Sequence, residues 1–216
     1  MSNSLETINI EFRKSFHKVF KKPELIQSFL TKRSNKFDEI IKKEFLRREL
    51  ETDFALVALG GYGRKELFPS SDIDLSIIQF NPKTKKIDEI KDFIGWLWTL
   101  KVKVGHSVRS LRDIEQITKS DLKEFTSYLS HRVIFCKKNK VASLNGDLNK
   151  ILKKWNKTKF FKAKRLEQNH RFKSFDSTEF SLEPDLKESP GCLRDFQTAL
   201  WILEYCFELK TLQNCA

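Results

Sequence analysis

The chain has 216 residues, of which 39% are hydrophobic and 32% charged, with 41 Lys and Arg against 29 Asp and Glu for a net charge of +12. This balance is typical of a folded globular protein and excludes wholesale disorder, and no uncharged run approaches the ~20 apolar residues of a membrane span. The first residues lack the basic start and apolar stretch of a secretory signal, so we expect a cytoplasmic protein without membrane association.

The first half of the chain predicts helices followed by two strands. Residues 1–50 have apolar residues at helical spacing, with Pro23 starting or breaking a helix. Phe54–Leu59 is a short apolar run that stops at two glycines, which predicts a buried strand and a tight turn. Asp72–Ile78 alternates polar and apolar residues, which predicts a second strand with one buried face.

The second half predicts one more strand and then helices almost to its end. Ile87–Leu100 is helical in pattern, and Lys101–Arg109 predicts the third strand. Beyond Leu111 we expect helices with breaks near residues 145–146, 175–178 and 183–191. The sequence therefore predicts a small α/β unit, roughly residues 51–110, embedded in helices.

Positive charge is densest between Lys150 and Phe175, where Glu167 is the only acid. We interpret this tract as a solvated basic helix face. The net charge would attract nucleotides, nucleic acid or acidic protein surfaces, but it equally fits a composition rich in Lys, Phe, Asn and Ile. No aromatic–basic platform accompanies the charge, so we expect no nucleic-acid partner.

Three of the seven glycines fall in the short segment Gly60–Gly63. A glycine-rich turn after a buried strand lets backbone N–H groups approach an anion closely. The same pattern also suits an ordinary strand-to-helix turn, so the turn alone does not identify a site.

Asp72 and Asp74 strengthen this interpretation because residues i and i+2 of a strand point to the same face. Two adjacent carboxylates repel unless a cation lies between them, and Mg²⁺ held there could bridge nucleotide phosphates. A lone pair of aspartates at a strand end can also be merely solvated. The combination with the glycine turn favours a metal-dependent nucleotide site.

Three ordered blocks of sequence resemble one enzyme family. They are GGYGRKELFPSSDIDL at residues 60–75, VGHSVR at residues 104–109 and LEPDLKESPGCLRD at residues 182–195. All three are similar to the PII uridylyltransferase/uridylyl-removing enzymes. The resemblance extends over nearly the whole chain.

The resemblance implies an α+β fold with a polymerase-β-like nucleotidyltransferase head, that is, a small mixed sheet with helices, followed by a helical region. On this basis we expect a helical N-terminal segment over residues 1–50, the nucleotidyltransferase domain over 51–140 and a truncated helical substrate-binding region over 141–216. The implied catalytic and metal-binding residues, for Mg²⁺ or Mn²⁺, are Asp72 and Asp74. The implied nucleotide-binding residues are Gly60, Gly61, Arg64, Ser71, Lys187 and Arg194.

The chain departs from the family pattern at two positions and lacks two further features. Lys65 stands where the family usually has glycine, and Cys192 stands where a second glycine normally follows Gly191. No third carboxylate is evident; Asp121 has a family counterpart but would equally be a helix N-terminal acid. No His-Asp dipeptide is present, so we expect neither the uridylyl-removing domain nor the ACT domains.

The function that the resemblance implies is Mg²⁺-dependent transfer of UMP from UTP to a tyrosine of the PII nitrogen-regulatory protein. One alternative is adenylyl transfer to glutamine synthetase by a related head. Another is a non-catalytic remnant that only binds a PII-like partner. No residue in the sequence distinguishes uracil from adenine.

Overall fold

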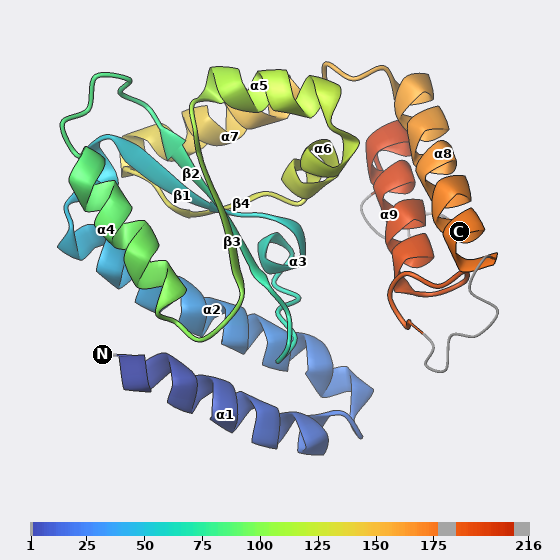
Figure 1. Ribbon diagram of the computed structural model, residues 1–216, viewed down its shortest axis with the longest axis horizontal. Helices are drawn as coiled ribbons and strands as arrows, with labels where there is room; N and C mark the ends of the chain where they lie inside the picture. Colours follow the sequence, from blue (N-terminus) through green and yellow to red (C-terminus); the bar gives the residue numbers. More distant parts are fainter. Residues whose placement is uncertain (1, 177–184, 210–216) are drawn as a thin grey trace.

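The computed structural model describes residues 2–176 and 185–209. Its centre is a four-stranded mixed sheet with the strand order β3-β2-β1-β4 (Figure 1). β1 is antiparallel to both of its neighbours, whereas β2 and β3 are parallel. The strands are β1 (Phe54–Ala58), β2 (Ile73–Gln79), β3 (Val104–Arg109) and β4 (Arg132–Phe135). The small mixed sheet with helices confirms the predicted α+β class.

Helices surround this sheet. In the described part of the chain they are α1 (Ser2–Val19), α2 (Pro23–Arg47), α3 (Gly60–Gly63), α4 (Ile87–Trp98), α5 (Leu111–Ser120), α6 (Leu122–Leu129), α7 (Lys138–Leu152), α8 (Lys157–Asp176) and α9 (Leu193–Phe207). Pro23 begins α2, as predicted, because proline lacks the N–H that the first helical turn leaves unpaired. Among the described helices, none has both the length and the apolar character needed to cross a bilayer.

Alternation along β1 builds a core on each face of the sheet. Leu56 and its even-numbered neighbours pack with Phe37 and Phe45 of α2 and Phe93 of α4. The odd-numbered residues pack instead with α5, α6 and α7, through side chains such as Phe125. The sheet is therefore the middle of three layers. Even-numbered and odd-numbered residues of β1 pack against the helices on opposite faces.

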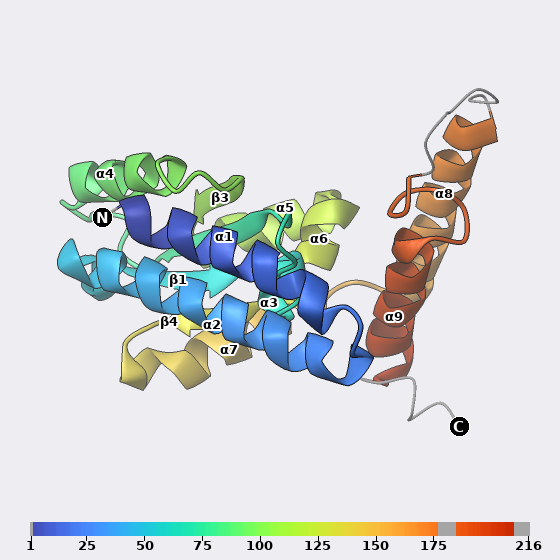
Figure 2. The same cartoon turned by 90° about the horizontal axis from the view of Figure 1, so that it is seen from below.

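The helical hairpin of α8 and α9 stands beside the layered body (Figure 2). An aromatic cluster joins the two parts: the Phe125 ring centroid lies 5.4 Å from that of Phe160 and 5.1 Å from that of Tyr205. The Tyr205 hydroxyl also donates to the carbonyl oxygens of Leu152 and Trp155, at 2.9 and 2.7 Å. This packing fixes α8 and α9 as a wall facing the open end of the sheet.

Two details of the predicted secondary structure are wrong. Residues 132–135 form β4, although helices were expected beyond Leu111; four residues at a half-buried sheet edge give too short a pattern to separate a strand from a helix. The expected break at residues 145–146 does not occur, because α7 continues through Gly146, where the missing side chain faces open space. The expected breaks at 175–178 and 183–191 fall partly outside the described residues.

Candidate active site

A cleft of about 1110 Å³ separates the end of the sheet from the α8–α9 hairpin. All eight residues that the sequence singled out line it, although they come from two distant parts of the chain. They are Gly60, Gly61, Arg64, Ser71, Asp72, Asp74, Lys187 and Arg194. The structure thus brings the predicted residues together, while their roles stay predictions.

The two aspartates lie at the start of β2. Asp74 belongs to the strand and Asp72 precedes it, so strand alternation turns both carboxylates toward the same side and into the cleft. Lys103 forms an ion pair with Asp72 at 3.0 Å. No hydrogen bond or ion pair joins the Asp74 carboxylate to any described residue. Asp74 is therefore free to bind a ligand.

The Asp74 carboxylate sits in a slot between two glycines. A Cβ atom added to Gly105, its partner across the parallel β2–β3 pair, would lie 2.7 Å from Asp74 Oδ1. A Cβ on Gly60 would lie 3.3 Å from Asp74 Oδ2, and Gly60 also has a positive φ of 54°. The position of this carboxylate thus favours glycine at residue 105, and the backbone conformation favours glycine at residue 60. Gly105 lay in the second sequence block, but only the strand register reveals this contact.

The pKa of Asp74 is raised above its usual value. Partial desolvation by the cleft walls is the main cause, and the charge of Asp72 adds to it. Lys187 and Lys103 act in the opposite direction. A cation between the two carboxylates would relieve their repulsion, which is the electrostatic signature expected of a metal-binding pair.

A buried network of polar side chains holds the glycine turn in place. Arg132 of β4 donates from Nε to the Gly63 carbonyl at 3.1 Å and from Nη2 to the Tyr62 carbonyl at 3.2 Å. Its Nη1 also pairs with Asp38 Oδ2 of α2 at 2.6 Å, and the Tyr62 hydroxyl donates to Asp38 Oδ1 at 2.6 Å. The turn is therefore tied to both α2 and β4, and sequence reasoning missed this support because it missed β4.

Arg64 and Ser71 already have partners within the protein. Arg64 donates from Nε to Glu66 at 2.7 Å and from Nη1 to the Ser130 hydroxyl at 3.2 Å. The Ser71 hydroxyl accepts a hydrogen bond from the Phe68 N–H at 3.1 Å, which closes the turn that leads into β2. Either side chain could still face a ligand in the cleft, but each also has a structural task.

Lys187 and Arg194 line the cleft on the side of the α8–α9 hairpin, and they differ in whether their cations already have partners. The Lys187 ammonium makes no ion pair within the described part of the chain, and its charge acts on Asp74 across the cleft. Arg194, by contrast, donates from Nη2 to Glu188 at 2.8 Å and from Nη1 to Gln197 at 3.1 Å. Lys187 is thus the more available group for a phosphate.

The two departures from the family pattern have different consequences. Lys65 has a positive φ of 61°, which explains why glycine suits this position. The Lys65 ammonium donates to Asn35 of α2 at 2.8 Å. Lys65 does not line the cleft, so its side chain links the turn to α2 and does not contact a ligand there. Cys192 has an ordinary extended backbone (φ −93°), and any residue can occupy this position.

No third acid completes a metal cluster among the described residues. Asp121 is the N-cap of α6, where it accepts from the backbone N–H groups of Lys123 and Glu124 at 2.7 and 3.0 Å. Glu124 is near enough to help raise the pKa of Asp74, but both of its oxygens are bound by Arg109, at 2.6 and 2.9 Å. The pair Asp72–Asp74 thus stands without a free third carboxylate in this part of the chain.

The cleft is also lined by residues that sequence reasoning did not select. On the side of the layered body they are Lys123, Thr126 and Ser127 of α6, and on the far wall, formed by α8 and α9, they are Lys164, Glu167, Arg171, Gln197 and Trp201. Lys164 lies in the tract that was expected to be a solvated basic face, yet it is buried. The lone acid of that tract, Glu167, was the one signal in the sequence that pointed here.

Comparison with known proteins finds relatives in one enzyme family. A family model described as GlnD PII-uridylyltransferase matches residues 159–216. A protein of Hydrogenovibrio crunogenus, named bifunctional uridylyltransferase/uridylyl-removing enzyme, is 38% identical over 88% of this chain. Proteins of the same name from Pseudoalteromonas translucida and Pseudomonas aeruginosa are 36% and 35% identical over 92% and 89% of the chain. The predicted resemblance to this family is confirmed.

The similarity covers only part of each of these relatives. The matched regions are 21%, 23% and 22% of the three proteins, so the chain spans about a fifth of the length of the curated relatives it matches. Their names describe enzymes that add and remove uridylyl groups. This chain is similar to one part of such enzymes, and its own activity is a proposal.

Proposed function

We propose that the chain carries the nucleotidyl-transfer site of a cytoplasmic uridylyltransferase, which moves UMP from UTP to a tyrosine hydroxyl of the PII nitrogen-regulatory protein. The observation that carries this proposal is the single cleft in which the glycine turn, the two aspartates and the loop cations meet. These groups are separated by more than a hundred residues in sequence, and a cleft lined by both cations and carboxylates suits a triphosphate with its metal.

The carboxylates fit a divalent cation in their chemistry. Mg²⁺ and Mn²⁺ take oxygen ligands, and Asp74 offers a carboxylate without a competing partner in the described structure. Asp72 and Asp74 would hold the ion, which when bound neutralises phosphate charge and favours an attacking oxygen nucleophile. Lys103, which now pairs with Asp72, would be displaced outward or would contribute a further phosphate contact.

The remaining groups would position the triphosphate and the acceptor. Gly60 and Gly61 allow the backbone close approach to a phosphate, and Lys187 supplies a cation without an internal partner among the described residues. Asp72 and Asp74 would also assist the removal of the proton from the tyrosine hydroxyl. Positioning of this kind contributes a large part of the rate in phosphoryl-type transfer.

The direct test is transfer of radiolabelled UMP from UTP to purified PII protein by the full chain, with Mg²⁺. Asp74→Asn should abolish transfer, whereas Asp147→Asn, which changes an exposed aspartate of α7 outside the cleft, should not. Preferential transfer of AMP to glutamine synthetase would replace the proposal with the adenylyl alternative. Binding to PII without any transfer would show a non-catalytic binding module.

A further inference from the structure

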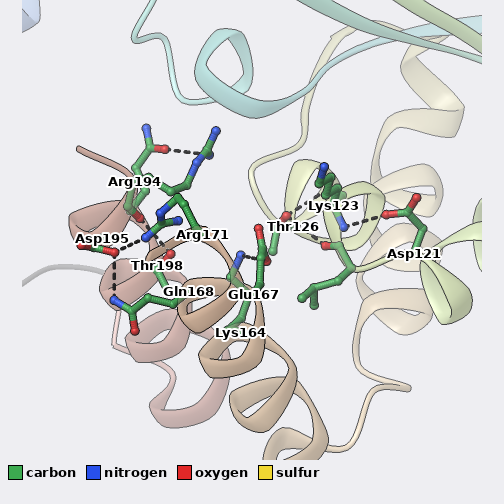
Figure 3. A network of polar contacts seen from close by, with 12 residues as sticks. Asp121, Lys123, Thr126, Lys164, Glu167, Gln168, Arg171, Arg194, Asp195 and Thr198 are labelled. Carbon is green, nitrogen blue, oxygen red and sulfur yellow. Dashed lines mark hydrogen bonds and ion pairs between the residues drawn. The ribbon is translucent and has the colours of Figure 1, made fainter. Parts of the chain in front are cut away.

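The far wall of the cleft contains a polar group of side chains that the phosphate and metal roles leave unused. Lys164 and Glu167 lie one turn apart on α8, where they face Thr126 and Lys123 of α6 (Figure 3). Gln197 of α9 lines the same cleft. Because these side chains line the cleft, the hydrogen-bonding groups that they leave unpaired are available to a ligand.

Lys164 fixes the position of the Glu167 carboxylate. The Lys164 side chain is only 2% exposed, and its ammonium donates to Glu167 Oε2 at 2.6 Å and lies 4.6 Å from the centroid of the Trp201 ring. A buried ammonium is costly unless it is paired, so this contact holds both side chains in place. Glu167 Oε1 accepts nothing from the described residues, and the side chain is 29% exposed to the cleft.

The Gln197 side chain also has a defined orientation, because a neighbouring cation binds one end of its amide. Its Oε1 accepts a hydrogen bond from Arg194 Nη1 at 3.1 Å, and Arg194 is itself anchored to Glu188. The amide nitrogen of Gln197 must then be the free end, and it donates to no described residue. The wall thus offers a ligand a donor from Gln197 and an acceptor from Glu167, whereas the buried ammonium of Lys164 holds that acceptor in place.

The cleft itself connects this wall to the aspartates. Asp74 and Lys187 line the same cleft as Glu167 and Gln197. A ligand with its phosphates at Asp74 and Lys187 would therefore have the rest of its length in the cleft that Glu167 and Gln197 line. The base of a nucleotide is the part that lies farthest from its phosphates, so it is the part that would meet this wall.

We propose that Glu167 and Gln197 recognise the uracil base of the nucleotide, with Lys164 holding the Glu167 carboxylate in place. This proposal names the specificity determinant of the proposed function and rests on it. The edge of uracil has an N3–H donor between the acceptors O2 and O4, so the N3–H would donate to Glu167 Oε1 and one of the two oxygens would accept from the Gln197 amide. Cytosine and adenine instead present a ring nitrogen lone pair to the Glu167 carboxylate. Guanine presents its 2-amino donor where uracil has an acceptor.

Nucleotide affinity of the full chain, measured by calorimetric titration with Mg²⁺ and each of UTP, CTP, ATP and GTP, tests this proposal. A carboxylate that accepts a hydrogen bond should favour UTP over CTP by ~10-fold or more. Glu167→Gln keeps an acceptor for Lys164 but turns an amide donor toward the base, so the preference for UTP should disappear or change in favour of CTP. Retention of the full preference in this variant overturns the proposal.

Two further variants keep the test decisive. Glu115→Gln removes an equally exposed, ion-paired carboxylate of α5 outside the cleft, at 30% exposure, and should leave all four affinities unchanged. If Glu167→Gln does not fold, Gln197→Leu serves instead, because Arg194 keeps its bond to Glu188; UTP affinity should fall several-fold and the preference over CTP should narrow.

Failure of this proposal differs measurably from failure of the proposed function. Equal affinity of the wild-type chain for all four nucleotides, with binding that Asp74→Asn weakens, overturns base recognition at this wall and leaves the nucleotidyl-transfer site intact. Absence of binding to every nucleotide overturns both proposals. A preference for UTP that Glu167→Gln and Gln197→Leu both relax supports both.

Discussion

Gly105→Ala should slow UMP transfer strongly without unfolding the protein. The new methyl group would lie 2.7 Å from Asp74 Oδ1, whereas ordinary contact begins near 3.4 Å, so the carboxylate must move by about 0.7 Å. The backbone at Gly105 has no positive φ, and an exposed carboxylate can rotate away at small cost in folding free energy. Misplacement of a reacting group by ~1 Å costs ~100-fold in rate, so we expect the rate of UMP transfer to fall by about ten- to a hundredfold.

The assay is UMP transfer at saturating UTP and Mg²⁺, together with the melting temperature of each variant. Gly95→Ala is the matched control, because a Cβ at this position of α4 meets nothing within 4 Å and should stabilise the helix by ~0.5–1 kcal/mol without changing transfer. Full transfer activity of Gly105→Ala would refute the assigned role of Asp74. A large drop in its melting temperature would refute the claim that only the carboxylate moves.

Three other substitutions test the supports of the site. Lys65→Gly should be ~1 kcal/mol more stable to urea than Lys65→Ala, because both lose the Asn35 contact and only alanine keeps a Cβ at φ 61°. Arg132→Met should lower the unfolding free energy by ~2 kcal/mol, because it removes the cation that pairs with Asp38. Asp38→Asn in the same chain should recover part of this loss. An unchanged urea midpoint would contradict a stabilising role for the Arg132–Asp38 ion pair. Asp74→Asn should raise the melting temperature of the metal-free chain at neutral pH, because it removes a carboxylate that is partly desolvated and lies beside the charge of Asp72; equal melting temperatures would contradict this cost of ionised Asp74.

Much of the sheet could be predicted because its residues give local signals. The alternation in β2 and the apolar run of β1 stand next to the glycine turn, so the strand ends and the direction of both aspartates follow from period-two geometry. The position of Gly105 beside Asp74 could not be predicted in the same way. It depends on the parallel register of β2 and β3, which pairs residues 31 positions apart across an intervening helix.

The far wall was hidden from the sequence for another reason. Lys164 looks like any solvated lysine in a basic tract. Its partner Glu167 lies three residues later in the same helix, but the Trp201 ring that covers the ammonium comes from α9, and only the packing of α8 on α9 supplies it. Periodicity indicates which face of a helix is apolar, but α8 has a weak pattern and buries a cation. A charged residue that is buried by a partner on another helix leaves no local trace.

The charge arrangement of the cleft also sets a pH dependence whose sign can be derived. Because the pKa of Asp74 is raised in the folded chain, the folded state binds its proton more tightly than the unfolded state, and ionised Asp74 costs stability. That cost is full above the raised pKa, falls as the pH drops through it and is absent well below 3.8, the usual value. The stability gained by Asp74→Asn should therefore shrink as the melting curves are repeated at lower pH. Mg²⁺ should stabilise the wild-type chain at neutral pH and lose this effect over the same range, because protons and the ion compete for the same oxygens. A benefit of the substitution that stays constant down to pH values below 3.8 would mean that the ionisation of Asp74 is not what destabilises the cleft.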